Sequence, residues 1–388
     1  MKTAVPETTE GPSVPQGAAH THREIHQQPL LWAEMASRLT QERSAIDVFL
    51  APLLAEARLR IVLTGAGTSA YAGQIARSAL ARATGRAVEA VATTDITAHP
   101  DTCFEEPDRP TLLVSFARSG NSPESIAATE IADRLLDHCA HLVITCNTDG
   151  ALADRHRHRA DSYVLLTPPE AEDQGFAMTS SLTCMLLGAL SALGGSSVQG
   201  LDDCAAAARG LLSGAVPARV EELTDRAPDR FVYLGSGALQ ALAGESALKL
   251  LELTGGAVTA LPESSLGFRH GPKAFLTQRT AAIVYVSNNP YTRQYDLDIF
   301  RELRGALPAG QVVAVAARPD GLPAEHTWLV EGMAEAEDAA LALPAVLCAQ
   351  LIALAASLAC GMRPDNPFPD GEVNRVVQGV TIHPLPAR

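Results

Sequence analysis

Residues 60–67 read RIVLTGAG, and residues 230–237 repeat the pattern as RFVYLGSG. In both segments an apolar run rich in β-branched residues ends in a Gly-x-Gly turn. A helical pattern of apolar residues follows each turn, at about 69–83 and about 239–254. A strand, a glycine turn and a helix in this order are typical of a parallel sheet that is covered by helices.

The two halves of the chain continue to resemble each other after these segments. The apolar run 112–116 corresponds to 283–287, and HLVIT at 141–145 corresponds to QVVAV at 311–315. Self-similarity over such a long period indicates a repeated structural unit. We therefore predict an α/β protein with two tandem units, each built on a doubly wound, flavodoxin-like parallel sheet.

This repeat also divides the chain of 388 residues into segments. The expected segments are a disordered leader at 1–22, a helical segment at 23–56, a first α/β unit at 57–215, a second unit at 216–375 and a tail at 376–388. The leader is rich in Pro, Thr, Gly and Ser and contains no apolar run, so it is not expected to form a core. The sequence GAVP at 214–217 interrupts two helical patterns and marks the boundary between the units.

The amino-acid composition excludes some classes of binding partner for this protein. The chain has 44 acidic and 30 basic residues and a formal net charge of −14, so it repels polyanions. The stretch closest to a membrane span, 341–360, contains Pro344, Gln350 and Ser357, which suits a buried helix better. We expect neither a nucleic-acid nor a membrane partner.

The cysteines indicate a reducing compartment. Seven are present, an odd number, and no two form a Cys-x-x-Cys pair. This pattern predicts neither a disulfide framework nor a zinc site. The N-terminal residues also lack the apolar core of a signal peptide, so a cytoplasmic protein is expected.

A Gly-x-Gly turn between a strand and a helix can bind an anion. The glycines allow the tight turn, and the first amide groups of the helix point at the anion. Residues 65–70, GAGTSA, fit the loose dinucleotide fingerprint, and Glu89 is an acid that could contact a ribose. The second copy has Gln240 at the third glycine position, which disfavours a dinucleotide. A sugar phosphate is the alternative ligand.

Two loops favour the sugar phosphate. Thr68 and Ser69 follow the first glycine turn, and the next apolar strand leads into SFARSGNSPES at 115–125. Loops that follow neighbouring parallel strands meet at the carboxyl edge of the sheet, where both could contact one phosphate. Arg118 offers a planar cation for bidentate contact with it. The alternative is that the second loop is simply a polar surface loop in which Ser122 or Asn121 caps a helix.

At these loops the chain resembles the sugar isomerase (SIS) family, whose units carry a G-x-G-T-S loop and an S-x-S-G-x-[ST] loop. The resemblance extends to LLVSFARSGNSPES at 112–125, LKLLELT at 248–254, GFRHGPK at 267–273 and VNRVVQGVT at 373–381. It is greatest to the AgaS branch, the tagatose-6-phosphate ketose/aldose isomerases and galactosamine-6-phosphate deaminases. The isomerase domain of glucosamine-6-phosphate synthase is a more distant likeness.

The loops and the resemblance together imply a phosphate site and neither a metal nor a redox cofactor. The residues assigned to phosphate binding are Gly67, Thr68, Ser69, Ser115, Arg118, Ser119 and Ser122. Ala117 stands where relatives have a serine, so one hydroxyl contact is lost. Arg118 or Ser115 could replace that contact.

Glu252 is the candidate base. It lies three residues after Lys249 on the second predicted helix, so both project from nearly one face, and Glu245 lies four residues before Lys249. The alternative is a solvated, ion-paired helix face. The surrounding sequence, ALKLLEL at 247–253, is apolar, and desolvation favours a neutral carboxyl, as a general acid or base near pH 7 requires. By resemblance, Glu252 moves a proton between C1 and C2 of an open-chain sugar, with Lys249 beside it.

By the same resemblance, His270 opens the sugar ring and reaches the active site of a neighbouring subunit, which implies a homodimer or a larger homo-oligomer. An imidazole suits proton delivery near pH 7. Gln378 stands where relatives that form a Schiff base have a lysine, and an amide cannot form one. A glutamine-dependent synthase is therefore not expected.

Three functions remain open. The first is an enzyme that deaminates and isomerises a hexosamine 6-phosphate to a ketose 6-phosphate through Glu252 and His270. The second keeps the proton abstraction at C2 but expels the C3 group, as a lyase or dehydratase of an N-acetylhexosamine 6-phosphate. The third is a non-catalytic sugar-phosphate sensor, which needs the loops but neither of those two residues.

Overall fold

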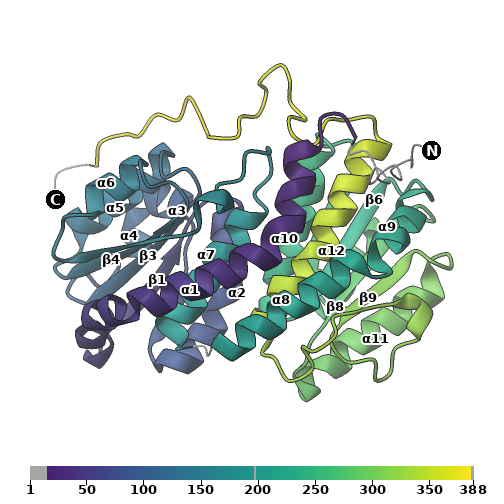
Figure 1. Cartoon of the computed structure of the whole chain (residues 1–388), viewed down its shortest axis with the longest axis horizontal. Coiled ribbons are helices and arrows are strands. Elements are labelled where there is room, and N and C mark those ends of the chain that lie inside the picture. Colours follow the sequence, from purple (N-terminus) through teal and green to yellow (C-terminus); the bar gives the residue numbers. More distant parts are fainter. Residues whose placement is uncertain (1–14, 196–197, 386–388) are drawn as a thin grey trace, which may run out of the picture.

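Two parallel sheets, one in each half of the chain, form the framework of the fold (Figure 1). The computed structural model describes residues 15–195 and 198–385. The strands of the first sheet are β1 (Arg60–Thr64), β2 (Ala87–Ala90), β3 (Thr111–Ala117), β4 (Cys139–Thr145) and β5 (Ser162–Leu166). The strands of the second sheet are β6 (Arg230–Gly235), β7 (Thr259–Ser264), β8 (Thr280–Val286), β9 (Val312–Ala316) and β10 (Thr327–Leu329).

Helices alternate with these strands along the chain. The N-terminal half contains α1 (Ala19–Ala55), α2 (Thr68–Thr84), α3 (Thr93–Ala98), α4 (Pro100–Cys103), α5 (Pro123–Leu135), α6 (Ala151–His156) and α7 (Ser180–Gly194). The C-terminal half contains α8 (Val198–Ser213), α9 (Val216–Thr224), α10 (Ala238–Leu253), α11 (Pro290–Ala306) and α12 (Asp338–Ala359). Short 3-10 turns are η1 (Pro169–Ala171), η2 (Gly267–Arg269), η3 (Pro272–Phe275) and η4 (Ala324–His326).

The two sheets have the same topology. The first has the order β2-β1-β3-β4-β5, and the second, read in the same sense, has the order β7-β6-β8-β9-β10. Both are the doubly wound, flavodoxin-like order, in which every strand pairs in parallel with its neighbour. The prediction of an α/β protein with two tandem units is confirmed.

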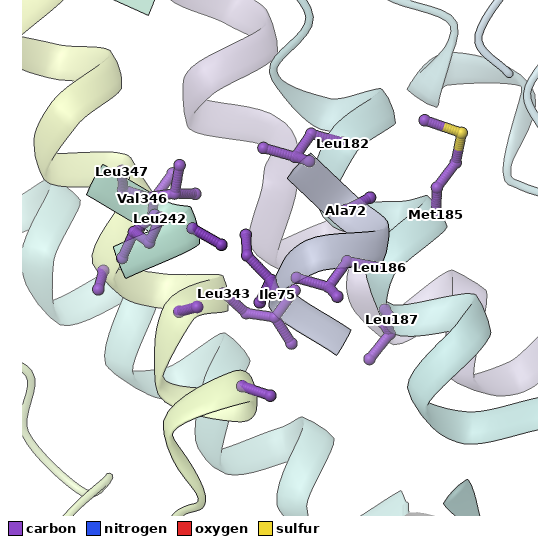
Figure 2. Close-up of a cluster of buried hydrophobic side chains, with 14 of the residues drawn as sticks. Ala72, Ile75, Leu182, Met185, Leu186, Leu187, Leu242, Leu343, Val346 and Leu347 are labelled. Atoms are coloured by element: carbon purple, nitrogen blue, oxygen red, sulfur yellow. The ribbon is translucent and has the colours of Figure 1, made fainter. Parts of the chain in front are cut away.

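A central layer of helices joins the two sheets into one core. Alternate residues of β1 face opposite sides: Ile61 and Leu63 belong to the central core, whereas Val62 packs under α3 and α5. Figure 2 shows the middle of the central core, where side chains from α2, α7, α10 and α12 meet. The labelled residues are Ala72, Ile75, Leu182, Met185, Leu186, Leu187, Leu242, Leu343, Val346 and Leu347. This packing brings the N-terminus of α2 close to α10.

Helix α1 lies along α7 and α8 in the centre of the molecule (Figure 1). It buries one stripe of side chains, including Ile25, Trp32 and Met35, at the spacing of an amphipathic helix. It begins at Ala19, within the region predicted as a leader, and residues 1–14 of that region lie outside the described residues. After α12, residues 360–385 run over the first unit without forming a helix or strand (Figure 1).

Helix α12 is, within the described residues, the one helix long and apolar enough to cross a membrane. Of its most apolar window, 89% is buried inside the fold. Its buried residues include Pro344 and Gln350, and the Gln350 amide oxygen accepts a hydrogen bond from Gln28 Nε2 at 2.7 Å. The prediction of a buried helix over this stretch is confirmed.

Candidate active site

The first glycine turn connects β1 directly to α2. Gly67 has φ +55° and ψ −127°, a conformation that L side chains rarely adopt. Gly65 has no room for a side chain, because a Cβ there would lie 2.6 Å from the carbonyl carbon of Ser69. The two glycines therefore allow α2 to begin at Thr68, immediately beside the carboxyl edge of the sheet.

Substituting Gly67 with alanine is expected to lower the free energy of unfolding by about 1–3 kcal/mol, the cost of a backbone region that only glycine adopts easily. The cost comes from the backbone alone, because a Cβ at Gly67 would meet nothing closer than Leu248 at 4.0 Å. Urea titration measures it. Gly210→Ala, in α8 and with no atom within 4 Å of its Cβ, is the control and is expected not to destabilise the fold. Equal unfolding midpoints for Gly67→Ala and the unchanged protein would show that alanine at this position is not strained.

A cavity of about 210 Å³ lies where the N-termini of α2 and α5 meet the C-terminal end of α10. The predicted residues in its lining are Gly67, Thr68, Ser69, Arg118, Ser119, Ser122 and Glu252. Ser115 is not among the lining residues, so its assignment to phosphate binding stays a prediction. Strand β3 continues to Ala117 and Ser115 lies inside it, 3% exposed and paired in register with Thr64.

The loop before α5 leaves hydroxyl groups at the cavity. Ser122 occupies the N-cap position, but its side chain makes no capping hydrogen bond to the helix. Asn121 instead accepts a hydrogen bond from the amide of Ala151 at 3.0 Å, and so binds the start of α6. Ser122 is therefore not used to cap α5, and the Ser122 hydroxyl remains available to a ligand.

Arg118 is a buried cation at this cavity. Only 7% of it is exposed, and its two terminal nitrogens donate to the carbonyl oxygens of Phe176 at 3.2 Å and Arg375 at 2.6 Å. Burial lowers the pKa of its guanidinium. Among the described residues, no carboxylate forms an ion pair with it. A desolvated cation with two neutral acceptors favours binding of an anion.

On the other side of the cavity, α10 carries a triad of ionisable groups, two of them fully buried. The Lys249 ammonium is fully buried, lies 3.6 Å from Glu245 Oε1 and donates a hydrogen bond to Glu252. The Glu252 side chain remains 26% exposed, so one carboxylate of the triad can reach a ligand. Thr68 Oγ1 donates to Glu245 Oε1 at 3.3 Å, which links the triad to the glycine turn.

Protonation balances the charges of this triad. Burial raises the pKa of Glu245 to about 8, against the lowering effect of the Lys249 ammonium. Burial alone would lower the pKa of Lys249, but the charges of Glu245 and Glu252 outweigh it and the pKa is raised. Near pH 7 the triad therefore holds the Lys249 ammonium and a proton on Glu245.

Glu245→Gln is expected to weaken the pH dependence of stability. In the unchanged protein Glu245 keeps its proton up to about pH 8, whereas its ordinary pKa of 4.5 makes it ionised in the unfolded chain. Stability therefore falls as pH rises from about 4.5 to about 8, and glutamine removes this contribution. Urea unfolding at pH 5, 6.5 and 8 tests it. A variant that loses stability with pH as steeply as the unchanged protein would show that Glu245 is already ionised in the fold.

His270 is not brought to this cavity within one chain. It follows η2 in the connection between β7 and β8, its side chain is exposed, and it is not a lining residue. Its expected action in a neighbouring subunit stays a prediction. Sequence analysis missed several other lining residues, namely Glu124, Phe176, Met178 and the tail residues 373–375. The tail motif indicated a likeness, but no local pattern placed it across the cavity.

In the second unit a cavity of about 430 Å³ lies at the corresponding place, between the second glycine turn and the start of α11, but several of its donors bind carboxylates of the chain itself. The loop after β8 donates to a carboxylate of the chain itself: Ser287 Oγ and the amide of Asn288 both bind Asp338, at 2.6 and 2.9 Å. In the second glycine turn, Ser236 Oγ donates to Asp296 at 2.6 Å. Internal carboxylates therefore occupy donors that the first unit leaves for a ligand.

Other features of the described residues do not compete with this cavity. No three His, Cys, Asp or Glu side chains within 15–195 and 198–385 lie close enough together to hold a metal ion. A larger cavity of about 680 Å³ lies between α8, α9 and β10, but mainly small and apolar residues line it. Its Arg219 already donates to the carbonyl oxygen of Thr327 at 2.6 Å.

Known proteins are similar to this chain over most of its length. The SIS domain model matches residues 53–193. A protein named AgaS in Streptomyces coelicolor (strain ATCC BAA-471 / A3(2) / M145) is 59% identical over 375 residues, which cover 96% of this chain and 97% of that protein. A D-galactosamine-6-phosphate deaminase AgaS of Escherichia coli is 44% identical over 371 residues, with 95% and 96% coverage.

A solved structure agrees over the whole fold. The crystal structure of tagatose-6-phosphate ketose/aldose isomerase from Escherichia coli has a TM-score of 0.88 and 41% sequence identity. It covers 97% of this chain and 100% of that chain. On its two sheets, its paired loops and these full-length relatives, the chain belongs to the sugar isomerase (SIS) domain family and to the AgaS branch within it.

Proposed function

We propose that this chain is an enzyme that deaminates and isomerises a hexosamine 6-phosphate to a ketose 6-phosphate, with D-galactosamine 6-phosphate as the first substrate to test. One observation carries the proposal: the cavity that contains the anion-binding loops is also lined by Glu252. A phosphate and the reactive end of one sugar would therefore share a single site. A non-catalytic sensor would have no use for the charged triad on α10.

Phosphate binding is assigned to the first unit. The N-termini of α2 and α5 both face the cavity, and the amide groups and dipoles of helix N-termini favour an anion. Ser69, Ser119 and Ser122 add hydroxyl donors, and Arg118 supplies the positive charge. A chain with a net charge of −14 can bind a phosphate here, because the field at the site depends on these few groups.

The reaction is assigned to Glu252. With the sugar ring open, the Glu252 carboxylate removes the proton from C2 of the amino aldose and the resulting enolamine takes a proton at C1. The product of this transfer is a 2-imino sugar, to which water adds and from which ammonia leaves. The sum is hexosamine 6-phosphate and water giving ketose 6-phosphate and ammonia. Lys249, which binds Glu252, stabilises its carboxylate form before the transfer.

The two activities named among the relatives are compatible with this scheme. A deaminase of an amino sugar phosphate and an isomerase of a ketose phosphate both move a proton between C1 and C2, and only the deaminase releases nitrogen from C2. Ring opening by His270 of a second subunit, a homo-oligomer and a cytoplasmic location remain parts of the proposal.

A substrate panel separates the alternatives. The protein is incubated with the 6-phosphates of galactosamine, glucosamine and their N-acetyl forms and with tagatose 6-phosphate, and the products are identified by mass spectrometry. The proposal predicts one ammonia per ketose 6-phosphate from a free hexosamine 6-phosphate. An ultraviolet-absorbing enone without ammonia would identify elimination of the C3 group, and binding without any product would identify a sensor.

A further inference from the structure

The two carbonyl groups that bind Arg118 come from distant parts of the chain. Phe176 lies between β5 and α7, and Arg375 lies in the segment that follows α12. The aromatic rings of Phe176 and Phe368 are in contact, with centroids 5.1 Å apart, so the two segments also touch each other. The direction of the guanidinium depends on both segments staying in place. The first turns of α1 contact both of them.

Glu24 of α1 binds the segment that carries Phe176. Its carboxylate accepts the amide of Gln174 at 2.6 Å and the amide of Gly175 at 3.1 Å, and it is only 1% exposed. A Cβ at Gly175 would lie 2.9 Å from Glu24 Oε2, so the carboxylate packs directly against the backbone of Gly175. Phe176, whose carbonyl oxygen accepts from Arg118, is the residue that follows Gly175.

The same end of α1 binds the segment that leads to Arg375. The carboxylate of Asp365 accepts the amides of His20 at 3.1 Å and Thr21 at 2.8 Å. Thr21 Oγ1 donates to it as well, at 2.8 Å. These bonds satisfy first-turn amides of α1, which otherwise lack partners. The start of α1 is thus a common support for both carbonyl groups that bind Arg118.

A negative charge on Glu24 costs free energy at this position. Asp173, which is fully buried and accepts the amides of Thr179, Ser180 and Ser181, faces it from the segment before α7. Burial first, and then the charge of Asp173, raise the pKa of Glu24 to about 7. Arg23, on the same helix and 3.5 Å away, only partly offsets this. A glutamine could accept an amide without the cost of a second buried charge.

We infer that Glu24 is a positioning residue for phosphate binding. Its ionised carboxylate holds the amides of Gln174 and Gly175, so that the Phe176 carbonyl keeps the Arg118 guanidinium directed into the cavity. A charged acceptor does this better than a neutral one, because hydrogen bonds to an ionised group are shorter and stronger. The inference rests on the proposed function in one respect: it takes Arg118 as a ligand of the phosphate.

Binding of inorganic sulfate tests the inference without a turnover assay, because sulfate mimics phosphate and does not titrate between pH 6 and 8. Glu24→Ala is expected to raise the sulfate dissociation constant about tenfold at pH 8, from the loss of two hydrogen bonds to a charged acceptor. Glu24→Gln retains one acceptor oxygen and is expected to recover most of the loss. Glu34→Gln, an exposed carboxylate of the same helix paired with Arg38, is the matched control and is expected to bind like the unchanged protein.

The pH dependence of sulfate binding distinguishes a positioning role of Glu24 from a purely structural one. At pH 6 Glu24 is mostly protonated and resembles glutamine, so Glu24→Gln and the unchanged protein are expected to bind sulfate equally. At pH 8 the variant is expected to bind about threefold more weakly. A ratio of dissociation constants that is the same at both pH values overturns the inference, even if Glu24→Ala does not fold. Arg118→Ala is measured alongside: if it binds sulfate as well as the unchanged protein, the phosphate site itself is wrong and the inference fails with it.

Discussion

Replacing Glu252 with glutamine is expected to lower turnover by about 1000-fold, within the range that general acid–base groups contribute. Glutamine has nearly the same shape and can still accept a hydrogen bond from Lys249, but it cannot take a proton from C2. Because the phosphate loops are untouched, KM is expected to change little. The measurement is the rate of ammonia release at saturating D-galactosamine 6-phosphate.

The control for Glu252→Gln is a carboxylate with a cation partner outside the cavity. Glu130 of α5 pairs with Arg155 at 2.6 Å and its side chain is 50% exposed, so Glu130→Gln removes a charge without removing a proposed base. It is expected to keep full turnover. If Glu252→Gln turned over substrate at the rate of Glu130→Gln, the assignment of the base would be wrong.

Replacing Arg118 with alanine is expected to raise KM about 100-fold, equivalent to about 2.7 kcal/mol of lost binding free energy. The Arg118 guanidinium is a buried, charged donor in the lining of the cavity near α2 and α5, and its burial strengthens its interaction with an anion. Arg118→Lys is expected to restore only part of the affinity, because an ammonium cannot bind two carbonyl oxygens and a phosphate in the planar geometry of arginine. Steady-state kinetics of both variants measure the effect.

A second buried arginine provides the control for this prediction. Arg293 in the second unit is also 7% exposed, and it donates to the carbonyl oxygens of Arg318 and Asp320, both at 2.8 Å. Arg293→Ala is expected to reduce stability without changing KM. Equal rises in KM for both arginine variants would mean that Arg118 acts through the fold and not through the phosphate.

The architecture was predictable from sequence because its signals are local. RIVLTGAG and RFVYLGSG each contain a buried strand and the glycines that the turn into α2 or α10 requires. Lys249 and Glu252 could be assigned to one helix face because the α-helical period brings residues three apart together. A sequence pattern of this kind depends on neighbours within a few positions.

The parts of the site that sequence analysis missed depend on contacts between distant residues. The motif does not show that β3 continues to Ala117, so the position of Ser115 inside the strand could not be predicted from it. The start of α1 at Ala19 depends on Asp365, which lies more than 300 positions away. The carbonyl of Arg375 and the bond from Thr68 to Glu245 likewise join segments that no local period relates.

The assignment of the site to a sugar phosphate is tested by the structure of the Glu252→Gln variant with D-galactosamine 6-phosphate bound, because the variant is expected to retain the substrate. We expect the phosphate group between residues 67–69 and 118–122, in contact with Arg118, and C2 of the open-chain sugar next to the side chain of residue 252. A phosphate bound elsewhere, or a sugar whose C1 and C2 point away from residue 252, would contradict it.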